Sequence, residues 1–107
     1  VRRYRRNVQG IVQEEPFEFR QAPPGAISSG TALFVDNDPA SRNLYIVDSA
    51  NETIYETSWA GTFNQGYRPR NVPDAFQDVR GFYADSVARN NMYLLAGNRL
   101  YHFLRFP

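Results

Sequence analysis

The chain has 107 residues, of which 42% are hydrophobic and 15% aromatic, and its formal net charge at pH 7 is +1. This composition predicts one folded domain with a modest core and argues against intrinsic disorder. The absence of cysteine excludes disulfide scaffolds, thiol nucleophiles and thiolate metal sites, and the absence of lysine excludes Schiff-base chemistry and P-loops. No apolar run reaches the roughly 18 residues that span a bilayer, so the sequence predicts a soluble segment with no membrane span.

The first residues, VRRYRRNVQGIV, form a basic arm with two possible conformations. Apolar residues recur at helical spacing at four positions: Val1, Tyr4, Val8 and Ile11. Gly10 disfavours a helix, and an irregular strand is the competing prediction. The other face holds four arginines that could contact an anion such as phosphate: Arg2, Arg3, Arg5 and Arg6. Nucleic-acid-binding proteins usually carry basic charge well beyond one arm, so a solvated arm is favoured over a nucleic-acid partner.

Residues 16–20, PFEFR, predict a strand, because aromatic and charged side chains alternate and place Phe17 and Phe19 on one face. Pro16 ends any helix that precedes this strand. The following segment, QAPPGAISSG, contains Pro-Pro-Gly and Ser-Ser-Gly and therefore predicts a surface connection.

Residues 31–67 predict four antiparallel strands. Two unbroken apolar quartets, Ala32 to Val35 and Leu44 to Val47, indicate strands that are covered on both faces. Polar turns separate them from a half-polar third strand, Thr53 to Trp59, and a weaker fourth strand is expected around Thr62 to Tyr67. Four such strands in about 40 to 50 residues have the size of one β-propeller blade.

A turn-rich linker, YRPRNVPDAFQD, follows this group and carries Arg68 and Arg70. After the linker, the pattern predicts three more strands, at about residues 80–85, 91–95 and 99–106. The second group therefore contains one strand fewer than the first.

The two groups of strands are a sequence repeat. The chain reads TALFVDNDPASRNLYIVDSANETIY at 31–55 and GFYADSVARNNMYLLAGNRLY at 81–101. Equivalent residues lie 49, 48 and 46 positions apart: Asp36 and Asp85, Tyr45 and Tyr93, and Tyr55 and Tyr101. Repeats of this length are typical of stacked units that cannot bury both faces alone. The sequence therefore predicts an all-β fold of two blade-like four-stranded antiparallel meanders, the second incomplete, with a short N-terminal arm.

We expect residues 1–30 to form the arm and a separate strand, 31–75 the first blade-like repeat, and 76–107 the second, incomplete repeat. The separate strand could supply the missing fourth strand, within the chain or in a neighbouring one. Removal of residues 1–21 would then abolish assembly. Two such units would expose broad apolar faces, so we expect a homo-oligomer or association with the remaining blades of a longer chain.

The stretches LFVDNDPASRNLYIVDSANETIY and FYADSVARNNMYLLAGNRLY resemble the blades of NHL-type and related six-bladed β-propellers. Those repeats read roughly as apolar-x-Asp, turn, apolar-Tyr-Val-x-Asp, turn, Asn-x-x-Ile-Tyr. The likeness covers most of residues 31–106 and implies a scaffold shared by lactonases, lyases, binding modules and extracellular sensor domains. The second copy reads Leu95-Ala96-Gly97 where the pattern has an aspartate, which the first copy provides as Asp48.

A weaker resemblance, to small two-blade fucose-binding lectins that trimerise into a ring, is carried by TIYETSWAG. There Glu56 and Trp59 fall where such lectins place a sugar-binding glutamate and an aromatic residue. The second copy reads LYHFLRFP at this point and has neither residue.

Several acidic residues are candidate ligands or catalysts. Three aspartates, Asp36, Asp38 and Asp48, could supply oxygen ligands to calcium, but their spacing fails the EF-hand pattern and turn capping is favoured. Glu14 and Glu15 are adjacent, so their side chains point to opposite faces of a strand, and we expect solvated positions rather than an acid/base pair.

Four residues combine an aromatic platform with arginine forks near predicted loops, an arrangement that would hold a sugar or an acidic peptide: Trp59, Tyr67, Arg68 and Arg70. In the competing interpretation, Trp59 packs between the repeats while the arginines remain in water. The single histidine, His102, has no serine or carboxylate placed beside it by the sequence, so we expect a structural role rather than a catalytic base.

These patterns predict a non-catalytic binding or scaffolding module that mediates protein interaction or assembly, with no catalytic residue, metal or cofactor. The alternatives are a carbohydrate-binding lectin that forms a ring by oligomerisation and a fragment of a metal-dependent lactonase-type hydrolase. A protein or glycan partner is expected rather than nucleic acid, at an extracellular or periplasmic location.

Overall fold

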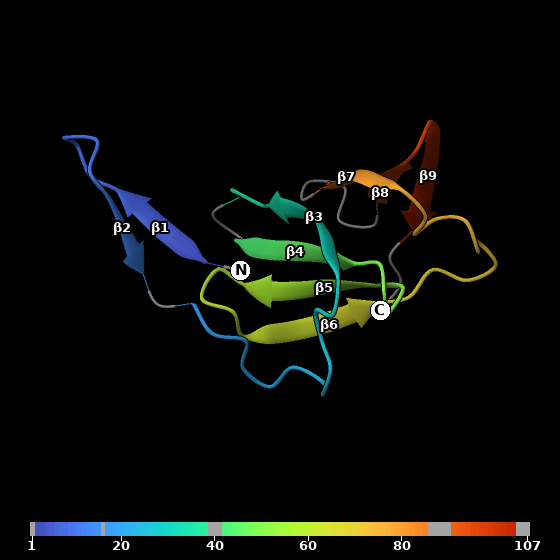
Figure 1. Ribbon diagram of the computed structural model, residues 1–107, viewed down its shortest axis with the longest axis horizontal. Helices are drawn as coiled ribbons and strands as arrows, with labels where there is room; N and C mark the ends of the chain where they lie inside the picture. The colour runs from blue at the N-terminus through green and yellow to red at the C-terminus, as the bar shows by residue number, and fades with distance from the viewer. Residues whose placement is uncertain (1, 16, 39–41, 86–90, 105–107) are drawn as a thin grey trace.

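The computed structural model describes residues 2–15, 17–38, 42–85 and 91–104. Within these ranges the chain is all-β, as predicted, and forms antiparallel sheets of two, four and three strands (Figure 1). No helix in these ranges is long and apolar enough to cross a membrane. Val1, Pro16 and the end of the last predicted strand, residues 105–106, lie outside the described residues.

The basic arm forms the two-stranded sheet, in which β1 (Arg3–Arg6) pairs antiparallel with β2 (Val12–Glu15). Asn7 closes the turn between them, because its side-chain Oδ1 accepts two backbone N–H hydrogen bonds at 2.9 and 3.0 Å. Gly10 supplies a positive φ of 83° in the same turn. Tight-turn residues thus override the helical spacing, and the strand prediction is the correct one for this arm.

The two repeats form the larger sheets, in the orders β3-β4-β5-β6 and β7-β8-β9. The strands are β3 (Gly30–Val35), β4 (Asn43–Asp48), β5 (Thr53–Ser58), β6 (Phe63–Tyr67), β7 (Val79–Ala84), β8 (Asn91–Ala96) and β9 (Arg99–Leu104). Consecutive strands are neighbours throughout, so each sheet is a meander. The predicted strands of both repeats are confirmed, with small shifts at their ends.

Burial differs from the prediction in the first strand of the four-stranded sheet. β4 is covered on both faces, as expected, and Val47 in it is fully buried. In β3, however, Leu33 and Val35 are 53% and 46% exposed. β3 is an edge strand of its sheet, so the residues that pack over the central strands β4 and β5 leave part of β3 exposed. The prediction of two covered faces is therefore wrong for β3.

The predicted strand at residues 16–20 does not form. Residues 17–19 are irregular, and Arg20 makes a single parallel bridge with Thr62 at the start of β6. The segment is held there by backbone hydrogen bonds from Glu18 N–H to the Ala60 carbonyl (3.3 Å) and from Arg20 N–H to the Gly61 carbonyl (3.1 Å). A Cβ at Gly61 would lie 2.2 Å from the Glu18 carbonyl oxygen, so only glycine permits this approach. The segment thus lies along the four-stranded sheet and does not complete the three-stranded one.

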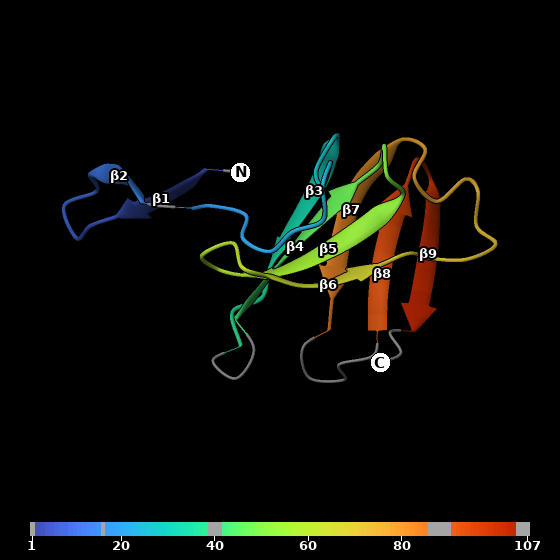
Figure 2. The same ribbon diagram turned by 90° about the horizontal axis from the view of Figure 1, so that it is seen from below.

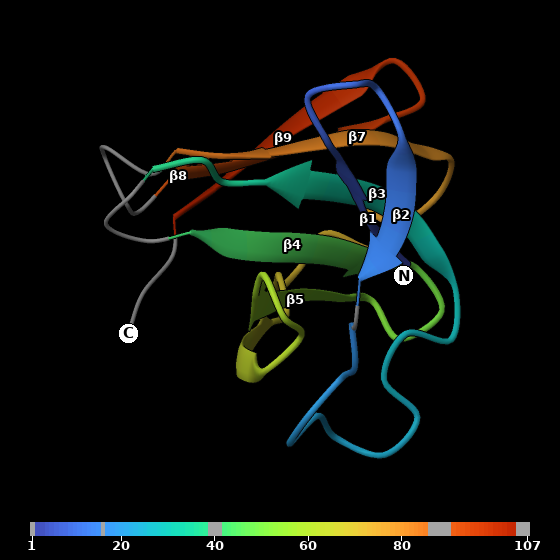
Figure 3. The same ribbon diagram turned by 90° about the vertical axis from the view of Figure 1, so that its left-hand side faces the viewer.

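The core lies between the four-stranded and three-stranded sheets, while the β1-β2 hairpin stands apart on the far side of the four-stranded sheet (Figure 2). Viewed from the hairpin, β3 and β4 lie behind it (Figure 3). Both sheets and the turn-rich linker contribute core residues: Tyr45, Val47, Ile54, Ala75, Phe76, Phe82, Ala84, Met92 and Leu94. The two sheets contact each other through β3 and β7.

The repeat seen in the sequence is also present in the geometry. Asp36 N–H donates to the Asn43 carbonyl at 2.9 Å, and in the second copy Asp85 N–H donates to the Asn91 carbonyl at 3.0 Å. The first strand of each copy has a register irregularity at the equivalent place, between residues 30 and 32 and between residues 79 and 81. The two copies therefore share their pairing pattern in detail, not only their strand order.

One pair of equivalent tyrosines has unlike surroundings. Tyr45 is buried between the two sheets and lies against Phe34 and Phe82. Tyr93 lies half-buried on the outer face of the three-stranded sheet, where it stacks on His102. The difference arises because no sheet of the described residues covers that outer face.

Candidate functional site

A groove of about 720 Å³ runs between the four-stranded and three-stranded sheets where their last strands, β6 and β9, lie. The linker after β6 forms part of its wall. The lining residues are Gln65, Gly66, Tyr67, Arg68, Pro69, Arg70, Met92, His102, Phe103 and Leu104. Three of the four residues predicted to bind a ligand, Tyr67, Arg68 and Arg70, thus share one groove.

The positions of two of these side chains are fixed by hydrogen bonds. The Tyr67 hydroxyl donates to Glu56 Oε1 at 3.1 Å, and Arg68 Nε donates to Thr53 Oγ1 at 3.1 Å. Arg68 keeps its two terminal nitrogens for other partners. Arg70 is exposed. No acidic side chain is among the groove-lining residues that the structure describes, so the groove favours negatively charged ligands.

His102 also lines this groove, a position that the sequence pattern does not predict. Its ring stacks on Tyr93 with centroids 4.7 Å apart and an interplanar angle of 11°, and its Nε2 lies 2.6 Å from Asn91 Oδ1. These contacts hold the ring in place. Its place in the groove depends on the register of β8 and β9 and on the position of the linker, neither of which the sequence pattern specifies.

Trp59 lies elsewhere, so the structure does not bring the four predicted ligand-binding residues together. It borders a second groove, of about 450 Å³, which is lined by Arg2, Arg3, Tyr4, Arg5, Glu15, Phe17, Leu33, Val35, Leu44 and Trp59. The guanidinium carbon of Arg42 lies over the indole, 5.4 Å from the ring centroid. Trp59 therefore stands between the arm and the four-stranded sheet, with one face occupied by an arginine.

Three of the four arginines of the arm pair with two glutamates on the neighbouring strand, so about half of the arm's positive charge is offset. Arg5 Nε lies 2.8 Å and Arg3 Nε 3.3 Å from the Glu15 carboxylate, and Arg2 Nε lies 3.5 Å from that of Glu14. Arg3 lies directly opposite Glu15 in the hairpin, and Arg5 reaches the same carboxylate diagonally. Because the pairs offset the charge, the arm offers less attraction to an anion than its sequence suggests. Arg6, the fourth arginine of the arm, is exposed.

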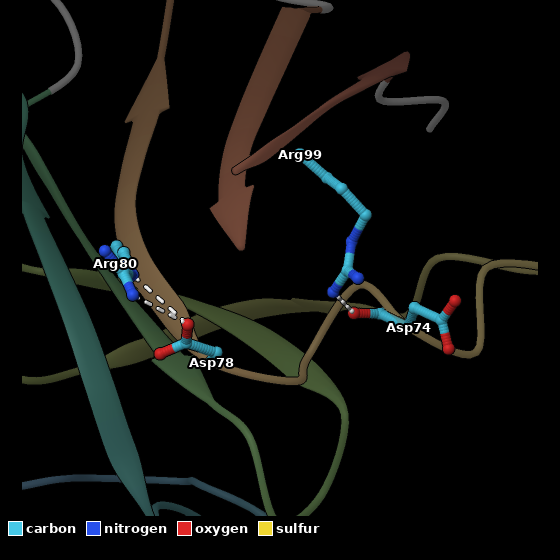
Figure 4. A network of polar contacts seen from close by, with 4 residues as sticks. All are labelled: Asp74, Asp78, Arg80 and Arg99. Atoms are coloured by element: carbon cyan, nitrogen blue, oxygen red, sulfur yellow. Dashed lines mark hydrogen bonds and ion pairs between the residues drawn. The ribbon is translucent and has the colours of Figure 1, made fainter. Parts of the chain in front are cut away.

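Two further arginines hold the linker rather than a ligand (Figure 4). Arg80 donates from Nε and Nη2 to Asp78 Oδ2 at 3.2 and 3.0 Å. Arg99 donates from Nη2 to the Asp74 carbonyl at 3.2 Å. Arg68 and Arg70 are thus the arginines of the inter-sheet groove, while Arg80 and Arg99 fix the chain before β7.

Two of the three aspartates considered as calcium ligands, Asp36 and Asp48, accept hydrogen bonds within turns. Asp48 is fully buried and accepts hydrogen bonds from Ser28 N–H (3.0 Å), Ser29 N–H (2.9 Å) and Asn51 Nδ2 (2.6 Å). Burial alone would raise the pKa of this carboxyl, but the hydrogen bonds together outweigh burial and the pKa is lowered. Asp36 accepts from Asp38 N–H at 2.9 Å. Within the described ranges, no group of three or more potential metal-ligating side chains occurs.

Comparison of the chain with protein-family models, with curated proteins and with solved structures finds no match. The likeness to propeller blades therefore stays a prediction made from sequence motifs. The candidate binding surfaces of the chain are the groove between β6 and β9 and the exposed faces of the sheets.

Proposed function

We propose that the chain is a non-catalytic binding or scaffolding module of β-propeller type, whose stacked sheets continue beyond the pair seen in this chain. The observation that carries the proposal is the apolar outer face of the three-stranded sheet. Large apolar side chains on this face are widely exposed: Tyr83 by 50%, Leu95 by 39%, Leu100 by 67% and Leu104 by 55%. A contiguous exposed apolar face of this kind is typical of an interaction surface.

The repeat indicates how the outer face is used. Tyr83 and Tyr93 on it are the counterparts of Phe34 and Tyr45, and both ring pairs have centroids 6.2 Å apart. Phe34 and Tyr45 lie against Phe82 of the next sheet, with centroid distances of 6.5 and 5.7 Å. The face that the four-stranded sheet buries against its neighbour is therefore equivalent to the outer face of the three-stranded sheet. That outer face is largely exposed, and at its β7 side the Tyr83 ring contacts Phe34 edge-on, with centroids 4.9 Å apart.

The same equivalence identifies the surface that would cover the outer face. Phe82 is the counterpart of Leu33, which lies on the opposite side of the four-stranded sheet and is exposed together with Val35. A second copy, or further sheets of a longer chain, would thus present Leu33 to Tyr83 in a head-to-tail contact. Such heterologous contacts form a closed ring when the rotation between units permits it. The hairpin borders the same face and would share it with the incoming sheet.

The roles of the carboxylates support a non-catalytic module. Glu15 pairs with arginines of the arm, Asp48 caps backbone N–H groups, and Glu56 accepts the Tyr67 hydroxyl. These three carboxylates thus each have a structural partner. An extracellular or periplasmic location belongs to the same proposal and is supported only by the resemblance to propeller sensor domains.

The solution mass of the chain tests this proposal. At tens of micromolar, light scattering should give a multiple of the 12.3 kDa chain mass, and Leu100→Glu should lower the mass to 12.3 kDa. The matched control is Val8→Glu, which should leave the mass unchanged because Val8 is fully exposed in the turn of the hairpin. A wild-type chain that stays at 12.3 kDa would contradict self-association through the outer face. Saturable glycan binding that is lost in Trp59→Ala would instead favour the lectin alternative.

A further inference from the structure

The groove between β6 and β9 follows the outermost strands of two sheets. β6 is the last strand of the four-stranded sheet and β9 the last strand of the three-stranded sheet. Consecutive residues of each strand line the groove, 65–67 in β6 and 102–104 in β9. Side chains alternate between the two faces of a strand, so three consecutive lining residues indicate that the groove includes the strand edge itself.

β9 lacks the neighbour that its counterpart has. In the first repeat the third strand, β5, pairs antiparallel with β6 through Ile54↔Tyr67 and Glu56↔Gln65. In the second repeat no strand of the described residues pairs with the outer edge of β9. Its outward N–H and C=O groups are therefore available to a strand from another molecule, the mode of recognition known as β-augmentation.

The side chains along the groove favour acidic partners. Arg68 and Arg70 project from the linker, and Arg68 uses only Nε for its bond to Thr53. Guanidinium groups bind carboxylates with two parallel N–H donors. Phe103 and Leu104 provide apolar surface beside the arginines. A strand with alternating acidic and apolar side chains matches both features, because its two faces then meet different walls.

We propose that this groove binds an acidic peptide in extended conformation, which pairs with the outer edge of β9 and places carboxylates on Arg68 and Arg70. This site goes beyond the stacking of sheets, since it uses the edge of β9, and Leu104 borders both this edge and the outer face. The two proposals can fail separately. Leu100→Glu should prevent assembly and leave peptide binding intact, whereas Arg70→Gln should weaken peptide binding and leave the solution mass unchanged.

The test is a titration of the full chain into a fluorescein-labelled octapeptide of alternating valine and glutamate, followed by fluorescence anisotropy. We expect saturable binding that is weakened about tenfold by Arg70→Gln, the loss of roughly one charge-assisted pair. The matched control is Arg20→Gln, an exposed arginine outside the groove, which should bind as the wild type does. Far-UV circular dichroism checks that each variant is folded.

Two altered peptides test charge and strand pairing separately. The peptide with lysine in place of glutamate should not bind, because it would meet Arg68 and Arg70 with like charge. The glutamate peptide N-methylated at alternate residues should bind at least tenfold more weakly, since it cannot donate to the edge of β9. Equal binding of the methylated peptide, full competition by inorganic phosphate, or an Arg70→Gln variant with wild-type affinity would each overturn the proposal.

Discussion

Replacing Leu94 with alanine should lower the free energy of unfolding by about 3 kcal/mol, because large-to-small changes in a packed core lose burial and leave a cavity. Leu94 is fully buried in β8 between the two sheets. Urea denaturation followed by far-UV circular dichroism measures the change. Performing it in the Leu100→Glu background keeps self-association out of the measured free energy.

The adjacent residue provides the control for this prediction. Leu95 lies on the opposite face of the same strand and is 39% exposed. Leu95→Ala should change the free energy of unfolding of that background by less than about 1 kcal/mol. Equal losses for the two variants would mean that the core does not lie between the sheets.

Replacing Asp48 with alanine should cost about 2 kcal/mol, because the buried carboxylate satisfies two backbone N–H groups and an amide at the entry to β3. The same denaturation experiment measures the loss. Asp74→Ala is the control, since Asp74 is an exposed turn aspartate of the linker. Its replacement should cost less than about 1 kcal/mol. Asp48→Ala with wild-type stability would contradict the capping role.

The lowered pKa of Asp48 adds a pH dependence with a definite sign. A carboxyl whose pKa is lower in the folded chain stabilises the fold above its unfolded value, near 3.8, and loses that contribution as the pH falls through the folded value. Stability of the wild type should therefore decline below about pH 4, and Asp48→Asn should show a smaller decline. An identical acid dependence in the two proteins would show that Asp48 does not contribute to it.

The strands and the repeat could be predicted from the sequence because apolar runs and polar turns alternate with a regular period. Asp36 and Asp85 show why this works: each follows a first strand and bonds to the residue that begins the second. Local turn chemistry could also have predicted the hairpin, since Asn7 and Gly10 are turn residues inside the helical spacing.

Tertiary placement accounts for what the sequence did not predict. The residues after Pro16 alternate like a strand, but backbone hydrogen bonds at Gly61 hold them in an irregular segment. Leu33 belongs to an unbroken apolar run, yet it is exposed because β3 is an outer strand. Trp59 and Tyr67 are close in sequence but line different grooves, because Trp59 precedes β6 and Tyr67 is at its other end.

The direction of stacking is the central claim, and cross-linking between two single-cysteine variants tests it most directly. The chain has no cysteine, so Tyr83→Cys and Leu33→Cys each introduce one reactive thiol. Head-to-tail contact predicts that a short bis-maleimide links the mixed variants efficiently and either variant alone poorly. Efficient linking of Tyr83→Cys to itself, or no linking in the mixture above that of a Val8→Cys control, would contradict it.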